Sequence, residues 1–123
     1  MKKLLPVIFA LLGVAFTSCR HNHDNLEISY HDADHEYKME ANFGRQKMRE
    51  VEYYLNRKLG TKNKVSFAGT HTDAMFTLDD QTQFYLRKSP GYVEIKLDKD
   101  ENSKAAYKRI KSMCEGMKLV LTK

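Results

Sequence analysis

The hydrophobic pattern of this chain changes its period at Gly44, and this change constrains the fold more than any other feature. From His35 to Phe43, apolar residues occupy every second position, which is typical of a strand with one buried face. From Gly44 to Gly60, apolar residues recur three or four positions apart, which predicts an amphipathic helix. The fold must therefore bury both a sheet face and a helix stripe.

After this helix, the sequence predicts further short strands separated by turn residues. The predicted strands are Val65–Ala68, Met75–Leu78, Phe84–Leu86 and Tyr92–Leu97. Asp79-Asp80-Gln81-Thr82 and Ser89-Pro90-Gly91 supply turn chemistry, because proline presets one turn position and glycine tolerates a positive φ. The last strand should point Val93, Ile95 and Leu97 into the core.

A second long helix should follow the capping residues of Asp98–Ser103 and run to about Leu121. Its expected core stripe is Ala106, Ile110, Met113, Met117 and Val120 or Leu121. The expected element order is β-α-β-β-β-α, with three or four strands between the two helices. We therefore expect an α+β fold, a two-layer sandwich of two amphipathic helices on an antiparallel sheet of about four or five strands.

The N-terminal stretch has the features of an export signal. Lys2 and Lys3 precede an apolar run from Leu4 to Phe16, and a small residue, Ser18, stands before Cys19. This apolar run is shorter than the roughly 20 residues that a membrane-spanning helix requires. It therefore predicts a signal peptide over residues 1–19.

The Phe16-Thr17-Ser18-Cys19 ending resembles the lipobox of bacterial lipoproteins, and its last three residues look like those of Bacteroidetes lipoproteins. Phe16 departs from the leucine that is usual at that position. The resemblance implies that Cys19 is acylated, with chains such as palmitate, and becomes the mature N-terminus. Arg20-His21-Asn22 lacks an inner-membrane aspartate signal, so the expected location is the cell envelope, anchored in the outer membrane and facing the periplasm.

Residues 20–34 are polar and predict a tether, followed by a single domain over residues 35–123. Within the tether, the alternation at Leu26–Tyr30 leaves open whether a short strand forms. Without residues 1–19 the chain keeps 19 basic and 16 acidic residues, a formal charge of +3. Lipidation of Cys19 would leave Cys114 alone, as a small apolar residue on a helix flank.

The strongest metal-ligating candidates are His31, Asp34 and His35, because imidazole and carboxylate groups together bind transition metals. Their spacing is not specific, and they lie where the tether meets the first predicted strand. A solvated tether is therefore the favoured interpretation. We expect no metal and no cofactor other than the lipid on Cys19.

Three tyrosines are candidates for partner binding. Tyr53 lies opposite the apolar stripe of the first helix, while Tyr85 and Tyr92 alternate with core positions of their strands. Alternatively, a loop or the tether could cover these tyrosines. The lysines of the second helix, in contrast, predict a solvated outer face; they are Lys104, Lys108, Lys111 and Lys118.

The stretch Ser103-Lys104-Ala105-Ala106-Tyr107-Lys108, together with the order helix, strands, helix, loosely resembles a double-stranded RNA-binding domain. That fold places a basic helix start against phosphates. Here Asp98, Asp100 and Glu101 surround the corresponding helix start. We therefore expect no nucleic-acid partner.

The sequence contains no phosphate-binding glycine loop, serine nucleophile motif or diagnostic carboxylate pair. We expect a lipid-anchored envelope protein that is not an enzyme and that binds another envelope protein, as a binding or assembly component. One alternative is an immunity lipoprotein that neutralises a toxin delivered to the periplasm. Another is a lipoprotein that binds a small ligand or a metal.

Overall fold

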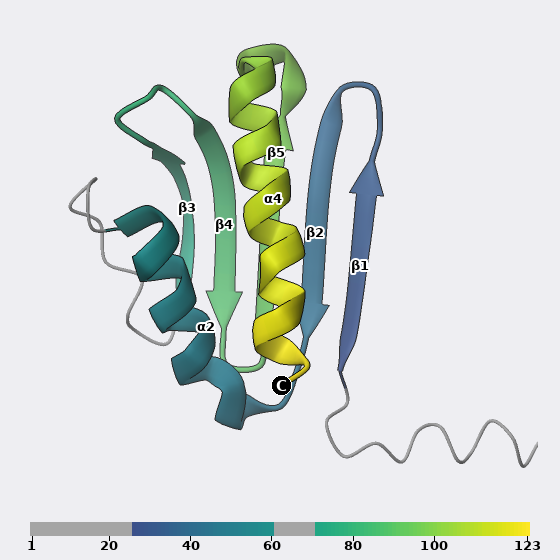
Figure 1. The fold of residues 1–123 in the computed structure, drawn as a ribbon, viewed down its shortest axis with the longest axis vertical. Coiled ribbons are helices and arrows are strands. Elements are labelled where there is room, and N and C mark those ends of the chain that lie inside the picture. The colour runs from purple at the N-terminus through teal and green to yellow at the C-terminus, as the bar shows by residue number, and fades with distance from the viewer. Residues whose placement is uncertain (1–25, 61–70) are drawn as a thin grey trace, which may run out of the picture.

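Five antiparallel strands form one sheet in the computed structural model, which describes residues 26–60 and 71–123. The order across the sheet is β1-β2-β5-β4-β3. The strands are β1 (Glu27–Asp32), β2 (Glu36–Asn42), β3 (Thr72–Thr77), β4 (Gln83–Ser89) and β5 (Tyr92–Asp98). Two long helical segments lie together on one face of this sheet (Figure 1), which confirms the predicted two-layer α+β fold.

The first helical segment has three consecutive parts. A 3₁₀ turn (Arg45–Lys47) leads into α2 (Met48–Leu55), and a π-helical turn (Asn56–Gly60) follows. Together they cover the stretch in which the sequence predicts a helix. The second segment consists of a 3₁₀ turn (Lys99–Glu101) and α4 (Lys104–Leu121), again as predicted.

The core lies between the helices and one face of the sheet. On β2 the alternating residues Tyr37, Met39 and Ala41 are at most 2 % exposed. On β5 the predicted core residues are also confirmed; Val93, Ile95 and Leu97 are at most 1 % exposed. The period-two pattern therefore identifies the buried face of both central strands correctly.

Strand β1 lies inside the stretch that the sequence assigns to the tether, so the ordered sheet begins at Glu27, before the expected boundary at residue 34. Ile28 pairs with Ala41 and Tyr30 pairs with Met39 across the antiparallel ladder. The free edge of β2 offers backbone hydrogen bonds to this short alternating segment, which local periodicity alone could not reveal. Residues 20–25, Cys19 and the predicted strand Val65–Ala68 lie outside the described residues.

Both predicted turns are present, and each contains one residue with a positive φ. Gly91 has φ +82° in the turn between β4 and β5, and its carbonyl accepts a hydrogen bond from the amide of Phe43 at 2.9 Å. In the turn between β3 and β4, Gln81 has φ +73° and the Thr82 amide donates to Asp80 Oδ1 at 3.1 Å. These turns fix the register of the three strands.

Helix α4 begins at a capped end, because the Ser103 side chain accepts a hydrogen bond from the amide of Ala106 at 3.0 Å. Its buried residues are Ala106, Ile110, Met113, Cys114, Met117 and Leu121. This set contains the predicted stripe and resolves its last position in favour of Leu121, while Val120 is half-buried. Cys114 is fully buried, beside the stripe.

Helices α2 and α4 approach each other closely at Gly116. The Tyr54 hydroxyl donates a hydrogen bond to the backbone carbonyl of Met113 at 2.8 Å. A Cβ atom at position 116 would overlap that hydroxyl oxygen. The glycine therefore makes room for a tyrosine that joins the two helices.

Candidate protein-binding surfaces

Two of the three candidate tyrosines lie on the sheet face that no described helix covers. Tyr85 on β4 pairs with Lys96 on β5, and Arg87 pairs with Glu94 in the next row. Met75 on β3 pairs with Tyr85, so it lies on the same face. We call Met75, Tyr85, Arg87 and Tyr92 the open-face patch; its members come from three adjacent strands.

Tyr85 is held in place by charged neighbours. Its hydroxyl donates to Asp73 Oδ1 on β3 at 2.7 Å, and the Lys96 ammonium lies 4.9 Å from the centre of its ring. The hydrogen bond to the Asp73 carboxylate raises the pKa of Tyr85. The ring therefore has a fixed orientation, with its hydroxyl committed to the neighbouring strand.

Tyr92 has a similar arrangement on β5. Its hydroxyl lies 2.9 Å from Glu40 Oε2 and 3.2 Å from Glu94 Oε1, and the Arg87 guanidinium carbon is 5.5 Å from the ring centre. Burial and the two carboxylates raise the pKa of Tyr92. Beside Tyr85, its cross-strand partner Met75 is 62 % exposed and offers apolar surface to solvent.

Tyr53 belongs to the opposite layer of the molecule. It projects from α2 and is 68 % exposed, with the Arg57 guanidinium carbon 5.7 Å from its ring centre. The three candidate tyrosines therefore do not form one surface. Tyr85 and Tyr92 lie on the same sheet face, on either side of Arg87 along the ladder, and Tyr53 lies on the helix layer.

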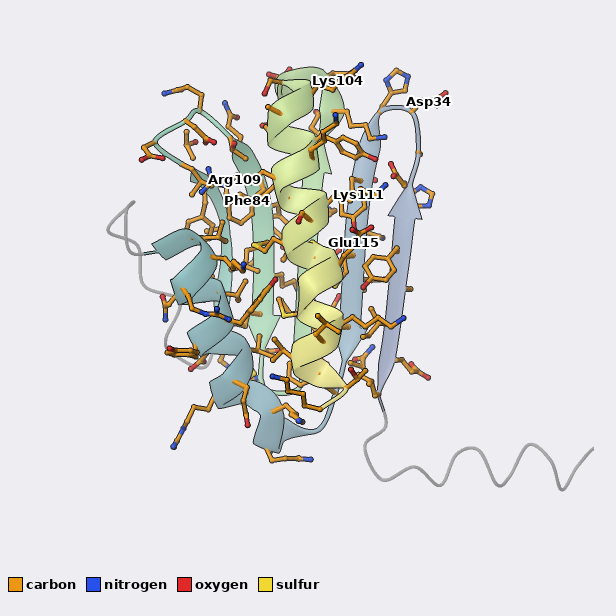
Figure 2. All side chains as sticks on the ribbon, viewed as in Figure 1. Asp34, Phe84, Lys104, Arg109, Lys111 and Glu115 are labelled. Carbon is orange, nitrogen blue, oxygen red and sulfur yellow. The ribbon has the colours of Figure 1, made fainter. Side chains whose placement is uncertain are left out.

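The three metal-ligating candidates are not brought together as a binding site. His31 lies on β1 opposite Lys38, and Asp34 lies in the turn after β1 (Figure 2). His35 Nδ1 instead contacts Asp100 Oδ2 at 3.0 Å, on the exposed surface. Within residues 26–60 and 71–123, no three His, Cys, Asp or Glu side chains are grouped so that they could hold a metal ion.

Asp32 is a charged hub that the sequence did not single out. Lys99 Nζ donates to its Oδ1 at 2.7 Å, the Tyr107 hydroxyl donates to its Oδ2 at 2.6 Å, and Lys111 Nζ lies 3.4 Å from Oδ2. These hydrogen bonds, that from Lys99 foremost, lower the pKa of Asp32 to about 2. Its role is to fasten the edge strand β1 to the 3₁₀ turn and to α4, across more than sixty residues of sequence.

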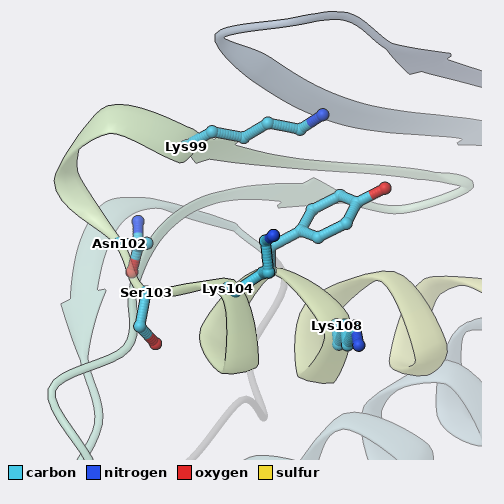
Figure 3. Close-up of a pocket in the computed structure, with 6 residues that line it drawn as sticks. Lys99, Asn102, Ser103, Lys104 and Lys108 are labelled. Carbon is cyan, nitrogen blue, oxygen red and sulfur yellow. The ribbon is translucent and has the colours of Figure 1, made fainter.

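An open cavity of about 480 Å³ lies beside this hub, at the start of α4 (Figure 3). Lys104 and Lys108 from the first turns of α4 line it, together with Lys99, Asn102 and Ser103. Two of these polar residues already serve the fold, since Asn102 Oδ1 accepts from the Gln83 amide at 2.8 Å and Lys99 contacts Asp32. The cavity carries positive charge and no nucleophile with an adjacent base.

Lys88 lies on the buried face of β4, with its ammonium 3.1 Å from Glu52 Oε2 on α2. Its side chain is fully buried, whereas that of Glu52 is 22 % exposed. This ion pair joins the sheet to the first helix. The alternation of Phe84, Leu86 and Lys88 would have placed this lysine on the core face.

Charge is divided unequally between the two surfaces. The helix layer, residues 45–60 and 104–123, contains eleven basic and three acidic residues. The alternating positions of the open sheet face contain six acidic and three basic residues. Those acids are Glu27, Glu36, Glu40, Asp73, Glu94 and Asp98, and the bases are Lys38, Arg87 and Lys96.

Cys114 has the environment of a structural cysteine. Burial raises the pKa of its thiol to about 12, so the reactive thiolate is strongly disfavoured. The backbone carbonyl of the same residue accepts a hydrogen bond from the Tyr30 hydroxyl at 3.4 Å. Cys114 therefore contributes to packing between α4 and the sheet.

Comparison of the chain with protein-family models, curated proteins and solved structures finds no match. Among the helices of the described residues, none combines the length and the apolar character that crossing a bilayer requires.

Proposed function

We propose that this chain is a lipid-anchored lipoprotein of the cell envelope, not an enzyme, whose α+β domain binds another envelope protein through the open-face patch. The observation that carries this proposal is the placement of Met75, Tyr85, Arg87 and Tyr92 on one face of adjacent strands. Tyrosine, methionine and arginine are enriched at protein interfaces.

The hydrogen bonds of the two tyrosines support the same function. Tyr92 lies on the central strand β5 and Tyr85 lies on the neighbouring strand β4. The hydroxyl of each is hydrogen-bonded to a carboxylate of an adjacent strand. A rigid aromatic side chain loses little conformational entropy when a partner binds, so more of the contact energy remains as affinity. The acidic surroundings of the patch favour a partner that carries positive charge around an apolar centre.

Anchoring is proposed to occur through Cys19, and its support is the sequence of residues 1–19. Two basic residues, an apolar run and a serine before the cysteine match a lipoprotein signal. A diacylglyceryl cysteine would hold the protein firmly on a membrane, because two acyl chains anchor far more stably than one. Because Arg20-His21-Asn22 carries no inner-membrane aspartate signal, we propose an outer-membrane location facing the periplasm.

A pull-down with matched double variants tests the binding function. Partners cross-linked to the full chain in envelope preparations would be identified, and their capture compared with that of Met75→Ser/Tyr85→Ser. The control is Leu119→Ser/Tyr53→Ser, which removes an aliphatic and an aromatic side chain that are 67 % and 68 % exposed on the other layer. We expect the first variant alone to lose the partner, at an unchanged melting temperature; equal loss in both variants would remove the patch as the site.

The anchor has its own test. Cys19→Ala should leave the chain without acyl groups, and labelled palmitate should enter the wild type only. Incorporation of label into the Cys19→Ala variant, or none into the wild type, would contradict the proposed lipidation.

A further inference from the structure

The outer surface of the helix layer exposes two large apolar side chains among cations. Tyr53 on α2 is 68 % exposed and Leu119 on α4 is 67 % exposed. Both stand opposite the buried stripes of their helices, so they point away from the sheet. Isolated exposed apolar residues are ordinary. These two differ because basic side chains surround them.

A groove between α2 and α4 gathers positive charge next to Tyr53. Its volume is about 470 Å³, and the basic residues that line it are Lys47, Arg49, Arg57 and Lys123. Glu50 is the one acidic side chain among the described residues that line it. The Arg57 guanidinium carbon lies 5.7 Å from the ring centres of both Tyr53 and Tyr54, two tyrosines that line the same groove.

The wider charge distribution extends this pattern over the whole layer. The two helical segments contain eleven basic and three acidic residues, a formal charge of +8. Two of these bases, Arg109 and Lys111, are paired with Asp80 and Asp32 outside the segments. Glu52 is one of the three acids, and it is paired with the buried Lys88. The open sheet face, with six acids and three bases, has the opposite sign. An anionic surface would therefore attract one face of the domain and repel the other.

The position of this surface in the fold is also informative. The start of α2, the end of α4 and the start of β1 lie at the same end of the molecule (Figure 1). Arg49 and Leu119 therefore lie toward the end of the molecule at which β1 begins. A membrane that holds the N-terminal segment would lie near this end of the helix layer.

We propose that the outer face of α2 and α4 docks on the anionic phospholipid headgroups of a membrane, with Tyr53 and Leu119 in the interfacial region. Basic side chains near an anionic bilayer each contribute attraction, and tyrosine favours the headgroup level. Short apolar insertions add to this electrostatic term in peripheral binding. The contact is distinct from the open-face patch and from the acyl anchor, and it leaves the patch pointing away from the membrane.

The dispersion of the charge favours a lipid surface over an acidic protein segment. The cations extend over two helices, as does the pair of exposed apolar residues. A laterally extended anionic plane can contact all of them together. An acidic peptide would instead occupy one groove.

Tryptophan fluorescence can test this contact in the full chain, because the natural sequence contains no tryptophan. Tyr53→Trp places the probe on the helix layer, and Met75→Trp places a matched probe on the open sheet face. Each variant would be incorporated through its N-terminal segment into vesicles of phosphatidylcholine alone, or mixed with phosphatidylglycerol. Emission wavelength and quenching by brominated lipid report contact with the bilayer.

We expect a blue shift and quenching for Tyr53→Trp on the mixed vesicles, and neither effect for Met75→Trp. The response should be lost at about 1 M salt, where the screening length falls to about 3 Å. Adding Arg49→Gln/Lys123→Gln should weaken binding to the mixed vesicles by about 30-fold, at about 1 kcal/mol per cation, whereas the equal charge change Lys38→Gln/Lys96→Gln on the sheet face should leave it unchanged. Circular dichroism melting confirms that each variant is folded.

Three outcomes would overturn the proposal. One is the same response on neutral and anionic vesicles. Another is equal quenching of both probes, which would show that both faces contact the lipid and that the domain has no preferred orientation. The third is that the emission of the tryptophan at position 53 does not change with vesicles but shifts with added polyglutamate, which would assign the surface to an acidic protein.

Discussion

Replacing Gly116 with alanine offers a direct test of how α2 and α4 are joined. In an unobstructed helix interior, alanine is more stable than glycine by about 1 kcal/mol. Here the added Cβ would overlap the Tyr54 hydroxyl, which donates to the Met113 carbonyl at 2.8 Å. The hydroxyl must move, and its hydrogen bond is lost with it.

The magnitudes decide the sign of the change. Overpacking of a core typically costs about 1–3 kcal/mol, and loss of a hydrogen bond costs about 1 kcal/mol. Against a gain of about 1 kcal/mol from helix propensity, Gly116→Ala should lower the free energy of unfolding by about 1–3 kcal/mol. Most glycine replacements inside helices would have the opposite effect.

Tyr54→Phe supplies the second arm of a double-mutant cycle. Alone, it should cost about 1 kcal/mol, because only the hydrogen bond is removed. In its presence the nearest described atom to the new Cβ is the ring carbon that bore the hydroxyl, at 3.4 Å, an ordinary contact. Gly116→Ala should then be neutral or stabilising by up to about 1 kcal/mol.

Urea unfolding of the four proteins, followed by circular dichroism, measures these differences as shifts in midpoint at constant slope. The expected coupling free energy is about 2 kcal/mol. The double variant should be more stable, by this amount, than the sum of the two single effects predicts. If Gly116→Ala stabilises the protein with Tyr54 in place, or has the same effect in both backgrounds, the close approach at Gly116 is wrong.

Two further predictions follow from pKa values. The folded pKa of Asp32, about 2, lies below its ordinary value of 3.8, so the ionised side chain stabilises the fold above pH 3.8 and this effect is lost as the pH falls toward about 2. Asp32→Asn should therefore be less stable than the wild type at neutral pH. When unfolding is measured at decreasing pH, this difference in stability should shrink between pH 3.8 and about 2. A deficit that does not depend on pH would contradict the ion-pair hub. In the Cys19→Ala chain, Cys114 is the remaining thiol. Its pKa of about 12 predicts no reaction with a thiol reagent at pH 8 until urea unfolds the protein. Rapid modification of the folded chain would show that the thiol is accessible.

Much of the fold follows from the local pattern of the sequence. The alternation over Tyr92–Leu97 and the stripe from Ala106 to Leu121 specify which side chains are buried, because side-chain direction repeats every two residues in a strand and every 3.6 in a helix. Ser103 and Gly91 similarly define a helix start and a turn through their own chemistry. These are properties of a few neighbouring residues, so the sequence is sufficient to predict them.

The surfaces were less predictable. Periodicity places Tyr85 and Tyr92 opposite the core, but it does not say that Met75 pairs with Tyr85 or that Glu40 reaches Tyr92. Those contacts depend on which strands become neighbours. The Lys88–Glu52 pair was not predicted from the sequence, because a charged residue ends the apolar run of β4. The alternation of Phe84, Leu86 and Lys88 could have indicated that this lysine is buried.

The sequence by itself determined the fold class, the buried faces and the motif at Cys19 on which anchoring is proposed. Only the tertiary structure decided that residues 27–32 belong to the sheet, that Asp32 fastens them to α4, and that Tyr53 and Leu119 share a cationic layer. The reason is physical: periodicity is encoded within one or two turns of chain, whereas the pairing of distant segments depends on the summed packing and hydrogen bonding of the whole domain.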